Sequence, residues 1–126
     1  MQKIKNYLCT LGILWCAFSF AENKETSCQQ LHADLGRVRV VDVRTPEEFS
    51  GSEGHIPGAQ LVTLGPELTR FLKEGNLEER IVFVCRSGRR SLQAVQESMA
   101  LGYQNTQSLK GGMLEWKAKG FPTDTP

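Results

Sequence analysis

A cysteine beside a short run of arginines is the residue of this chain best suited to chemistry. Cys85 follows the apolar run Ile81–Val84 and precedes a helical pattern of apolar residues that begins at Ser91. The free N–H groups at the start of a helix carry partial positive charge and stabilise an anion. The thiolate is the nucleophilic form of cysteine, and sites of this kind lower its pKa from about 8.5. The sequence therefore predicts a reactive sulfur in a site that attracts anions.

The loop between this cysteine and the helix supplies positive charge and a permissive backbone. Its members are Arg86, Ser87, Gly88, Arg89 and Arg90. Gly88 gives the loop the freedom in φ that a tight turn needs. The arginines and the loop N–H groups are expected to bind an anionic substrate and to stabilise departing charge. For Arg86 and Arg89, the alternative of solvated surface charges stays open.

A second pair of polar residues is expected at the same edge of the predicted sheet. Asp42 and Arg44 lie at the end of the valine-rich run 37–43 and directly after it, and such a run is typical of a strand covered on both faces. Strands that alternate with helices indicate a parallel sheet, and ligands bind outside the carboxyl ends of its strands. We expect Asp42 and Arg44 to support the Cys85 loop through hydrogen bonds, to form an ion pair at the strand end, or both.

Periodicity and turn residues predict the elements that position these side chains. Strands are expected over 37–43, 60–63, 81–84 and 106–109, and helices over 27–35, 91–101 and 113–119, with two more starting at Thr45 and Pro66. Thr45, Pro46 and Glu48 have the pattern of a helix start with a capping box. The chain is long enough for one α/β domain with one core. Residues 22–26 are expected to be flexible and the tail 121–126 to be frayed.

The N-terminus has the three-part pattern of a secretory signal peptide. Lys3 and Lys5 precede the apolar stretch 8–20, and small residues stand at the positions that a signal peptidase recognises. We predict a signal peptide over 1–21 and a single domain over 22–126, periplasmic or secreted and free of the membrane after cleavage. An uncleaved membrane anchor and a lipoprotein are the competing interpretations.

Charge and cysteine content narrow the classes of function. Lys3 and Lys5 leave with the predicted signal, so 13 of the 15 basic residues remain against 14 acidic ones. A chain close to neutral is not expected to bind nucleic acid through its overall field. The histidines and the remaining cysteines are scattered without ligand spacing, so neither a metal nor a cofactor is predicted. Cys28 is either a partly ordered thiol with no task or the partner of Cys85 in a disulfide.

Three groups of residues, in this order, resemble the signatures of the rhodanese family of sulfurtransferases. They are Asp42-Val43-Arg44 with 47–49 and 54–59, then the loop 85–90, then 111–116 with 120–122. The loop resembles the six-residue active-site loop of that family, with cysteine first and arginine last. The resemblance implies a rhodanese-like three-layer α/β fold, with a five-stranded, mostly parallel sheet flanked by helices.

The same resemblance implies an activity and a set of roles. Sulfane sulfur would pass from a thiosulfate-like donor to a thiophilic acceptor, cyanide or a thiol, through a persulfide on Cys85. The implied partners are small sulfur-containing anions, these acceptors, and an unidentified protein acceptor. By its position in the family motif, Arg90 is expected to turn its guanidinium inward and hold the loop. His55 is expected to serve packing and backbone contacts and not proton transfer.

Other functions for the same cysteine are weighed against this one. A phosphatase is disfavoured because arginine already occupies the sixth loop position, which makes a tighter cradle than a phosphoryl group needs. A persulfide carrier without turnover, and a thiol redox protein that uses Cys85 with Cys28, remain the alternatives.

Overall fold

The computed structural model describes residues 23–125. The predicted signal peptide over 1–21 and the predicted cleavage after Ala21 lie outside the described residues, so both stay predictions. No helix within 23–125 is long and apolar enough to cross a membrane.

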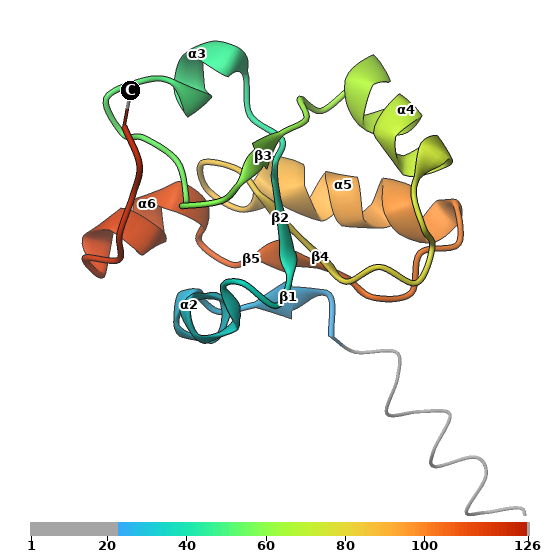
Figure 1. The fold of residues 1–126 in the computed structure, drawn as a ribbon, viewed down its shortest axis with the longest axis horizontal. Coiled ribbons are helices and arrows are strands. Elements are labelled where there is room, and N and C mark those ends of the chain that lie inside the picture. Colours follow the sequence, from blue (N-terminus) through green and yellow to red (C-terminus); the bar gives the residue numbers. More distant parts are fainter. Residues whose placement is uncertain (1–22, 126) are drawn as a thin grey trace, which may run out of the picture.

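Five strands form a single parallel sheet in the described part of the chain (Figure 1). They are β1 (Glu25–Thr26), β2 (Arg39–Asp42), β3 (Gln60–Leu61), β4 (Ile81–Val84) and β5 (Thr106–Leu109), in the spatial order β1-β5-β4-β2-β3. The predicted five-stranded α/β fold is confirmed, and every pairing in the sheet is parallel.

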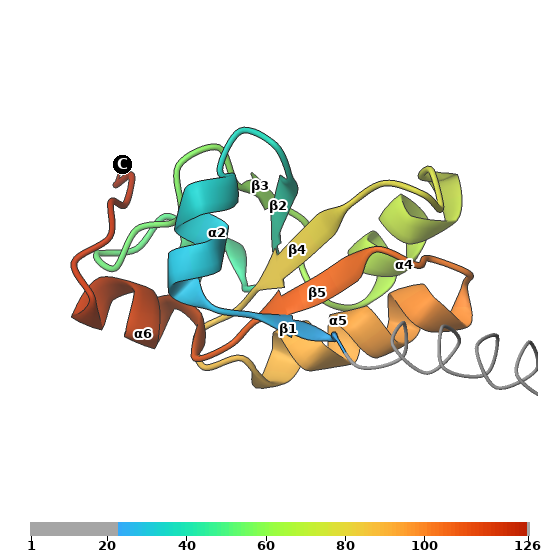
Figure 2. The same cartoon turned by 90° about the horizontal axis from the view of Figure 1, so that it is seen from below.

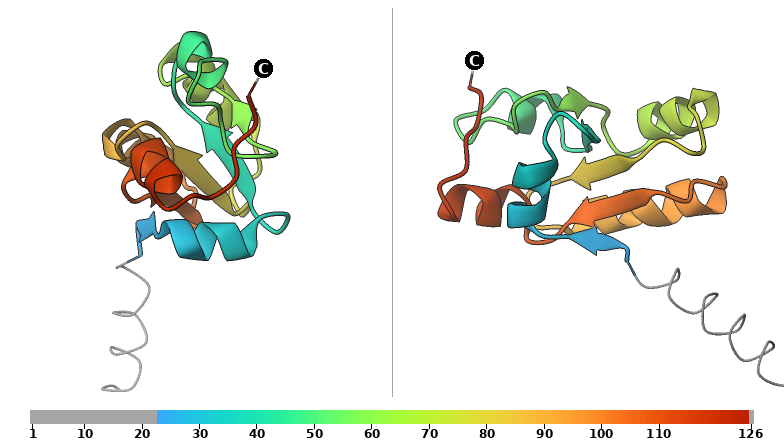
Figure 3. Two further views of the ribbon diagram at one scale, coloured as in Figure 1. Left: turned by 90° about the vertical axis from the view of Figure 1, so that its left-hand side faces the viewer. Right: turned by 60° about the horizontal axis from the view of Figure 1, so that its bottom comes forward.

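Helices cover both faces of this sheet (Figures 2 and 3). They are α2 (Cys28–Asp34), α3 (Pro46–Phe49), α4 (Pro66–Glu74), α5 (Arg89–Ala100) and α6 (Gly112–Ala118). Buried side chains of α4 and α5 form the core on one face, and those of α2 and α6 form the core on the other. The fold is therefore the three-layer arrangement that strand-helix alternation predicts.

The burial pattern of β4 decides which face the reactive cysteine occupies. Side chains of a strand alternate between faces. Val82 and Val84 belong to the α2/α6 core, whereas Ile81 and Phe83 belong to the α4/α5 core. Cys85 continues this alternation and packs in the α4/α5 core, under the helix that follows it.

The register between β2 and β4 brings the two predicted groups of polar residues to one edge. Asp42 pairs with Val84, and the Val43 N–H donates to the Val84 carbonyl at 2.9 Å. Continuing this register, Cys85 follows β4 beside Val43, the residue between Asp42 and Arg44. Both predicted groups therefore lie at the carboxyl ends of neighbouring parallel strands.

The N-terminal segment is ordered where the sequence predicts flexibility. Glu25 and Thr26 form the edge strand β1, in register with Ser108 and Leu109 of β5. The Lys110 N–H donates to the Thr26 carbonyl at 2.9 Å. Backbone hydrogen bonds hold this segment, and two polar residues give no periodic signal of a strand.

The C-terminal tail also differs from the prediction, because residues 121–124 are held against the domain. The Trp116 Nε1–H donates to the Pro122 carbonyl at 2.8 Å, and the Phe121 ring packs 4.9 Å from the Trp116 ring. Asp124 exchanges two backbone hydrogen bonds with His55, at 2.9 and 2.8 Å. These contacts replace the fraying expected of a short, proline-containing tail.

Candidate active site

The loop after β4 wraps closely around the Cys85 sulfur. Cys85 is fully buried, and the chain turns back at Gly88, whose φ of 102° lies in the left-handed region. Gly88 is also the N-cap of α5, and it has no side chain to accept the free N–H groups of the first turn. The helix begins at Arg89, two residues earlier than predicted, so Arg89 and Arg90 lie in that first turn.

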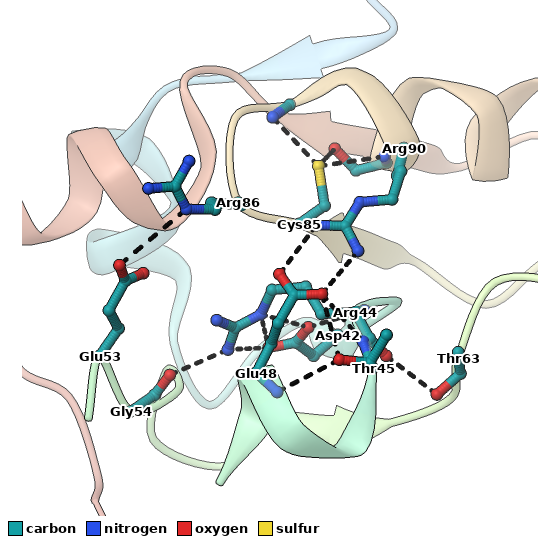
Figure 4. A network of polar contacts seen from close by, with 12 residues as sticks. Asp42, Arg44, Thr45, Glu48, Glu53, Gly54, Thr63, Cys85, Arg86 and Arg90 are labelled. Atoms are coloured by element: carbon teal, nitrogen blue, oxygen red, sulfur yellow. Dashed lines mark hydrogen bonds and ion pairs between the residues drawn. The ribbon is translucent and has the colours of Figure 1, made fainter. Parts of the chain in front are cut away.

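Hydrogen-bond donors converge on the sulfur from this turn (Figure 4). The Gly88 N–H donates to Cys85 Sγ at 3.0 Å, the Ser91 N–H donates to it at 3.4 Å, and the Ser91 hydroxyl lies 3.4 Å away. Burial raises the pKa of the thiol, but the Ser91 hydroxyl and the N–H groups of Ser91, Gly88 and Ser87 outweigh it. The pKa of Cys85 is therefore lowered from the ordinary value of a cysteine thiol. This environment favours the thiolate of Cys85 more than that of an ordinary cysteine.

Ser91 is not among the predicted site residues, because the sequence pattern marks it only as the residue after the loop. A signal was available, because the N–H groups of the first helical turn have no partner within the helix, and Ser91 lies in that turn.

The Cys85 loop also rests on the start of α6. The Met113 N–H donates to the Cys85 carbonyl at 2.9 Å, and the Leu114 N–H donates to the Arg86 carbonyl at 3.0 Å. A Cβ on Gly112 would lie 2.5 Å from both of these carbonyl oxygens. Glycine at this position is therefore required for the helix to approach the loop.

Arg90 joins the loop to α3 through a two-pronged ion pair. Its guanidinium donates to Glu48 Oε1 at 2.8 Å and to Oε2 at 2.9 Å. The hydrogen bonds from Arg90 lower the pKa of Glu48 to about 2, and the same contact raises the pKa of Arg90. Glu48 also closes the predicted capping box with Thr45. Its second role, as the partner of a loop arginine 42 residues away, was not predicted.

Asp42 and Arg44 form the buried ion pair that was one of their two predicted roles. Arg44 Nε donates to both Asp42 carboxylate oxygens, at 2.9 and 3.1 Å, and its NH2 group donates to Oδ2 at 2.8 Å. The same NH2 group donates to the Gly54 carbonyl at 2.9 Å. The pair therefore fixes the backbone around the site, and the hydrogen bonds described for it do not reach the Cys85 loop.

The remaining loop residues face solvent. Ser87 and Arg89 are exposed, and so is Arg86, whose Nε lies 4.0 Å from Glu53 Oε1. A cavity of about 210 Å³ opens beside the loop. It is lined by Arg44, Glu48, Gly51, Ser52, Glu53 and Arg86. Of the three loop arginines, Arg86 thus lines this cavity and Arg90 binds one of its acidic residues.

Cys28 is ordered, unlike the partly ordered thiol that the sequence suggested. It is the first residue of α2 and is buried in the α2/α6 core, while Cys85 is buried in the α4/α5 core. Both cysteines are free thiols. The sheet separates the two core clusters, so the predicted alternative of a Cys28–Cys85 disulfide is not present in this structure.

His55 makes the packing and backbone contacts expected of it. Its ring stacks on Phe49 with centroids 3.8 Å apart, and Nδ1 lies 3.1 Å from the Phe49 carbonyl. No group of three or more His, Cys, Asp or Glu side chains within residues 23–125 is placed to hold a metal ion.

Comparison with known proteins gives one consistent result. A family described as "Rhodanese-like domain" matches residues 27–119. A protein of Allochromatium vinosum named "Sulfurtransferase" is 36% identical over 100 residues, covering 79% of this chain and 91% of the relative. A human "Thiosulfate:glutathione sulfurtransferase" is 36% identical over 98 residues, covering 67% of this chain and 83% of the relative. The crystal structure of a rhodanese-related protein from Thermoplasma volcanium superposes with a TM-score of 0.73 at 25% identity, covering 82% and 99% of the two chains.

Proposed function

Because this chain belongs to the rhodanese-like domain family, we propose that it is a sulfurtransferase that carries sulfane sulfur as a persulfide on Cys85. The observation that carries the proposal is the set of donors around Sγ: the N–H groups of Gly88 and Ser91 and the Ser91 hydroxyl. They favour the thiolate, which is the form that attacks a sulfur donor.

In the first half-reaction, the Cys85 thiolate attacks the outer sulfur of a thiosulfate-like donor. A new S–S bond forms to Cys85 Sγ while the donor's own S–S bond breaks, and its electron pair leaves with sulfite. The thiolate and the dianion become a persulfide anion and a sulfite dianion, so the charge balances. We assign the stabilisation of the incoming and departing anions to the loop N–H groups and to the guanidinium of Arg86, which lines the cavity beside the loop.

In the second half-reaction, an acceptor attacks the outer sulfur of the persulfide and restores the thiolate. Cyanide would leave as thiocyanate, and a thiolate would leave as a new persulfide. Each half-reaction is simpler than direct transfer between two small anions, and the scheme predicts ping-pong kinetics. We propose small thiols or a protein thiol as the natural acceptor, and a periplasmic or secreted location for the reaction.

Sulfur loading followed by turnover tests this function. We expect thiosulfate to add one sulfur atom to the protein by intact mass, and peptide analysis to place it on Cys85. Thiosulfate with cyanide should then yield thiocyanate catalytically, and glutathione should unload the persulfide. A protein that gains no sulfur from thiosulfate would contradict the proposal.

A persulfide carrier without turnover is the second candidate, and it uses the same sulfur. The burial of Cys85 favours it, because an enclosed sulfur is shielded from thiols in solution. A carrier would gain sulfur from thiosulfate but would release thiocyanate or glutathione persulfide only stoichiometrically.

A further inference from the structure

A short chain of buried hydroxyls runs from the Cys85 sulfur into the core. Ser91 Oγ of α5 lies 3.4 Å from Cys85 Sγ and 2.6 Å from Ser108 Oγ of β5. Ser108 Oγ in turn lies 3.5 Å from the Gly88 carbonyl, within the loop that holds the sulfur. Cys85, Ser91 and Ser108 are all fully buried. The chain therefore begins and ends at the active-site loop.

The number of protons on these groups limits the directions in which the hydrogen bonds between them can run. Each serine hydroxyl has one proton to donate, a carbonyl only accepts, and a thiolate only accepts. When Cys85 is a thiolate, Ser91 donates to the sulfur, so the short contact between the serines must use the Ser108 proton. When Cys85 is a thiol, its S–H can donate to Ser91, Ser91 then donates to Ser108, and Ser108 donates to the Gly88 carbonyl. The two protonation states of the sulfur thus correspond to two opposite directions of the same chain.

We propose that Ser108 is a positioning residue for the nucleophile, which acts through Ser91 by donating to its oxygen whenever Cys85 is ionised. This inference deepens the proposed function, since it concerns the sulfur that would carry the persulfide. A hydroxyl that accepts a hydrogen bond donates more strongly, and hydrogen bonds to an anion are stronger than neutral ones. Loss of the Ser108 hydroxyl therefore weakens the hydrogen bond between Ser91 and the Cys85 sulfur more when the sulfur is a thiolate than when it is a thiol.

The serine substitutions leave the charged groups near the thiol unchanged. These include Asp42, Arg44, Glu48, Arg86, Arg89, Arg90 and Glu115. The hydrogen bonds and ion pairs described for these groups go to one another or to other partners, and not to either serine.

The same helix and strand provide a matched control. Ser98 of α5 lies 2.7 Å from Thr106 Oγ1 of β5, and both residues are buried. Ser98 also donates to the Val95 carbonyl at 2.7 Å. This pair repeats the α5–β5 hydroxyl contact at a place where the described bonds do not include the sulfur, so Ser98→Ala removes a comparable contact without touching the Cys85 chain.

The test is the pH profile of alkylation at Cys85 in the full-length protein. Iodoacetamide is the alkylating reagent, and peptide mass spectrometry measures the modified fraction. We expect Ser108→Ala to raise the midpoint of this profile by about half a unit to one unit, as the weakening of a charge-assisted hydrogen bond predicts. Ser91→Ala should raise it further, because that variant loses the donor itself. Ser98→Ala should leave the midpoint unchanged, and Ser108→Thr, which keeps the hydroxyl, should restore it.

The double variant Ser91→Ala/Ser108→Ala isolates the coupling. If Ser108 acts through Ser91, the double variant has the same midpoint as Ser91→Ala alone. An unchanged midpoint in Ser108→Ala, an equal shift in Ser98→Ala, or additive shifts in the double variant would overturn the proposal. Should Ser108→Ala fail to fold, a shifted midpoint in Ser108→Thr would also contradict it. Alkylation does not require sulfur transfer. Failure of the Ser108 proposal, seen in the alkylation profile, is therefore distinguishable from failure of the proposed function, seen as a wild-type protein that gains no sulfur from thiosulfate.

Discussion

The two cysteines of the described chain are both buried near the start of a helix, yet their environments have opposite effects on the pKa of the thiol. Burial raises the pKa of Cys28, and the charge of Glu115 adds to this, whereas the donors around Cys85 lower its pKa despite burial. The Cys28 Sγ–H has only a long contact, 3.9 Å, to the Lys110 carbonyl, which is an acceptor. Burial alone therefore does not decide whether a thiol is reactive.

The caps of the two helices explain the difference. At the start of α2, the Ser27 hydroxyl accepts a hydrogen bond from the Gln30 N–H at 3.0 Å, so a side chain uses one of the free donors. At the start of α5, Gly88 offers no side chain, and its own N–H and that of Ser91 reach the Cys85 sulfur. A helix start can activate a cysteine when the sulfur itself takes the place of the capping side chain.

Replacing each cysteine with serine tests this comparison, and the largest effect on activity is expected at Cys85. Cys85→Ser should abolish both sulfur loading from thiosulfate and thiocyanate production, because serine is not ionised at neutral pH. Cys28→Ser should leave both signals largely intact. Intact mass and a thiocyanate assay measure the two outcomes, and loss of turnover in the Cys28 variant would show that the two thiols cooperate.

Moving the Cys85 loop should make its cysteine behave more like Cys28. Gly112→Ala places a Cβ 2.5 Å from the carbonyls of Cys85 and Arg86, at a φ of 58°. We expect a loss of about 2–4 kcal/mol in the free energy of unfolding and a raised midpoint for alkylation of Cys85. Gly120→Ala is the matched control, since φ is 74° there and a Cβ would meet open space. That control should cost about 1 kcal/mol and leave the midpoint unchanged.

Breaking the ion pair between Arg90 of the loop and Glu48 of α3 should have a smaller effect on the free energy of unfolding. Glu48→Gln removes the carboxylate that binds Arg90, and we expect a loss of about 1–2 kcal/mol at pH 7, allowing for partial exposure to solvent. Because the pKa of Glu48 is lowered from 4.5 to about 2, its stabilisation is complete above pH 4.5 and is lost as pH falls toward 2.

Urea unfolding of wild type and Glu48→Gln across this pH range measures the effect. The two proteins should converge in stability at low pH, and a constant difference between them would show that the ion pair is not its source.

The capping serine of α2 should have the smallest effect. Ser27→Ala removes the acceptor for the Gln30 N–H and should cost about 1 kcal/mol in the free energy of unfolding. The alkylation profile of Cys85, on the other face of the sheet, should not change. Thermal unfolding and alkylation of the same variant test both statements, and a shifted Cys85 profile would contradict the independence of the two faces.

Local signals in the sequence predicted the parts of the fold that depend on neighbouring residues. The capping box of Thr45 and Glu48, the apolar run of β4 and the loop glycine Gly88 each have a short-range physical cause, and each is present in the structure. The same kind of short-range signal predicted that Cys85 lies between a strand and a helix.

Contacts between distant segments left no such signal. The ion pair of Glu48 with Arg90 and the chain from Ser91 to Ser108 depend on how α3, α5 and β5 are brought together. Ser108 occupies an inward position of β5, but a single sequence does not show that a hydroxyl on α5 will face it. The edge strand β1 was missed for a related reason, because its order comes from the partner strand and not from its own residues.

The ordered tail connects the helix that holds the Cys85 loop to a segment beside the cavity, two regions far apart in the sequence. Pro122 is bound by Trp116 of α6, the helix that holds the Cys85 loop, and Asp124 is bound by the backbone of His55. His55 follows the segment 51–53 that lines the cavity beside the loop. Any sequence fused to the carboxyl end would therefore begin close to this cavity. Its bulk would restrict which acceptors approach the Cys85 loop. The first strand of the described chain, β1, lies at the opposite edge of the sheet from β3.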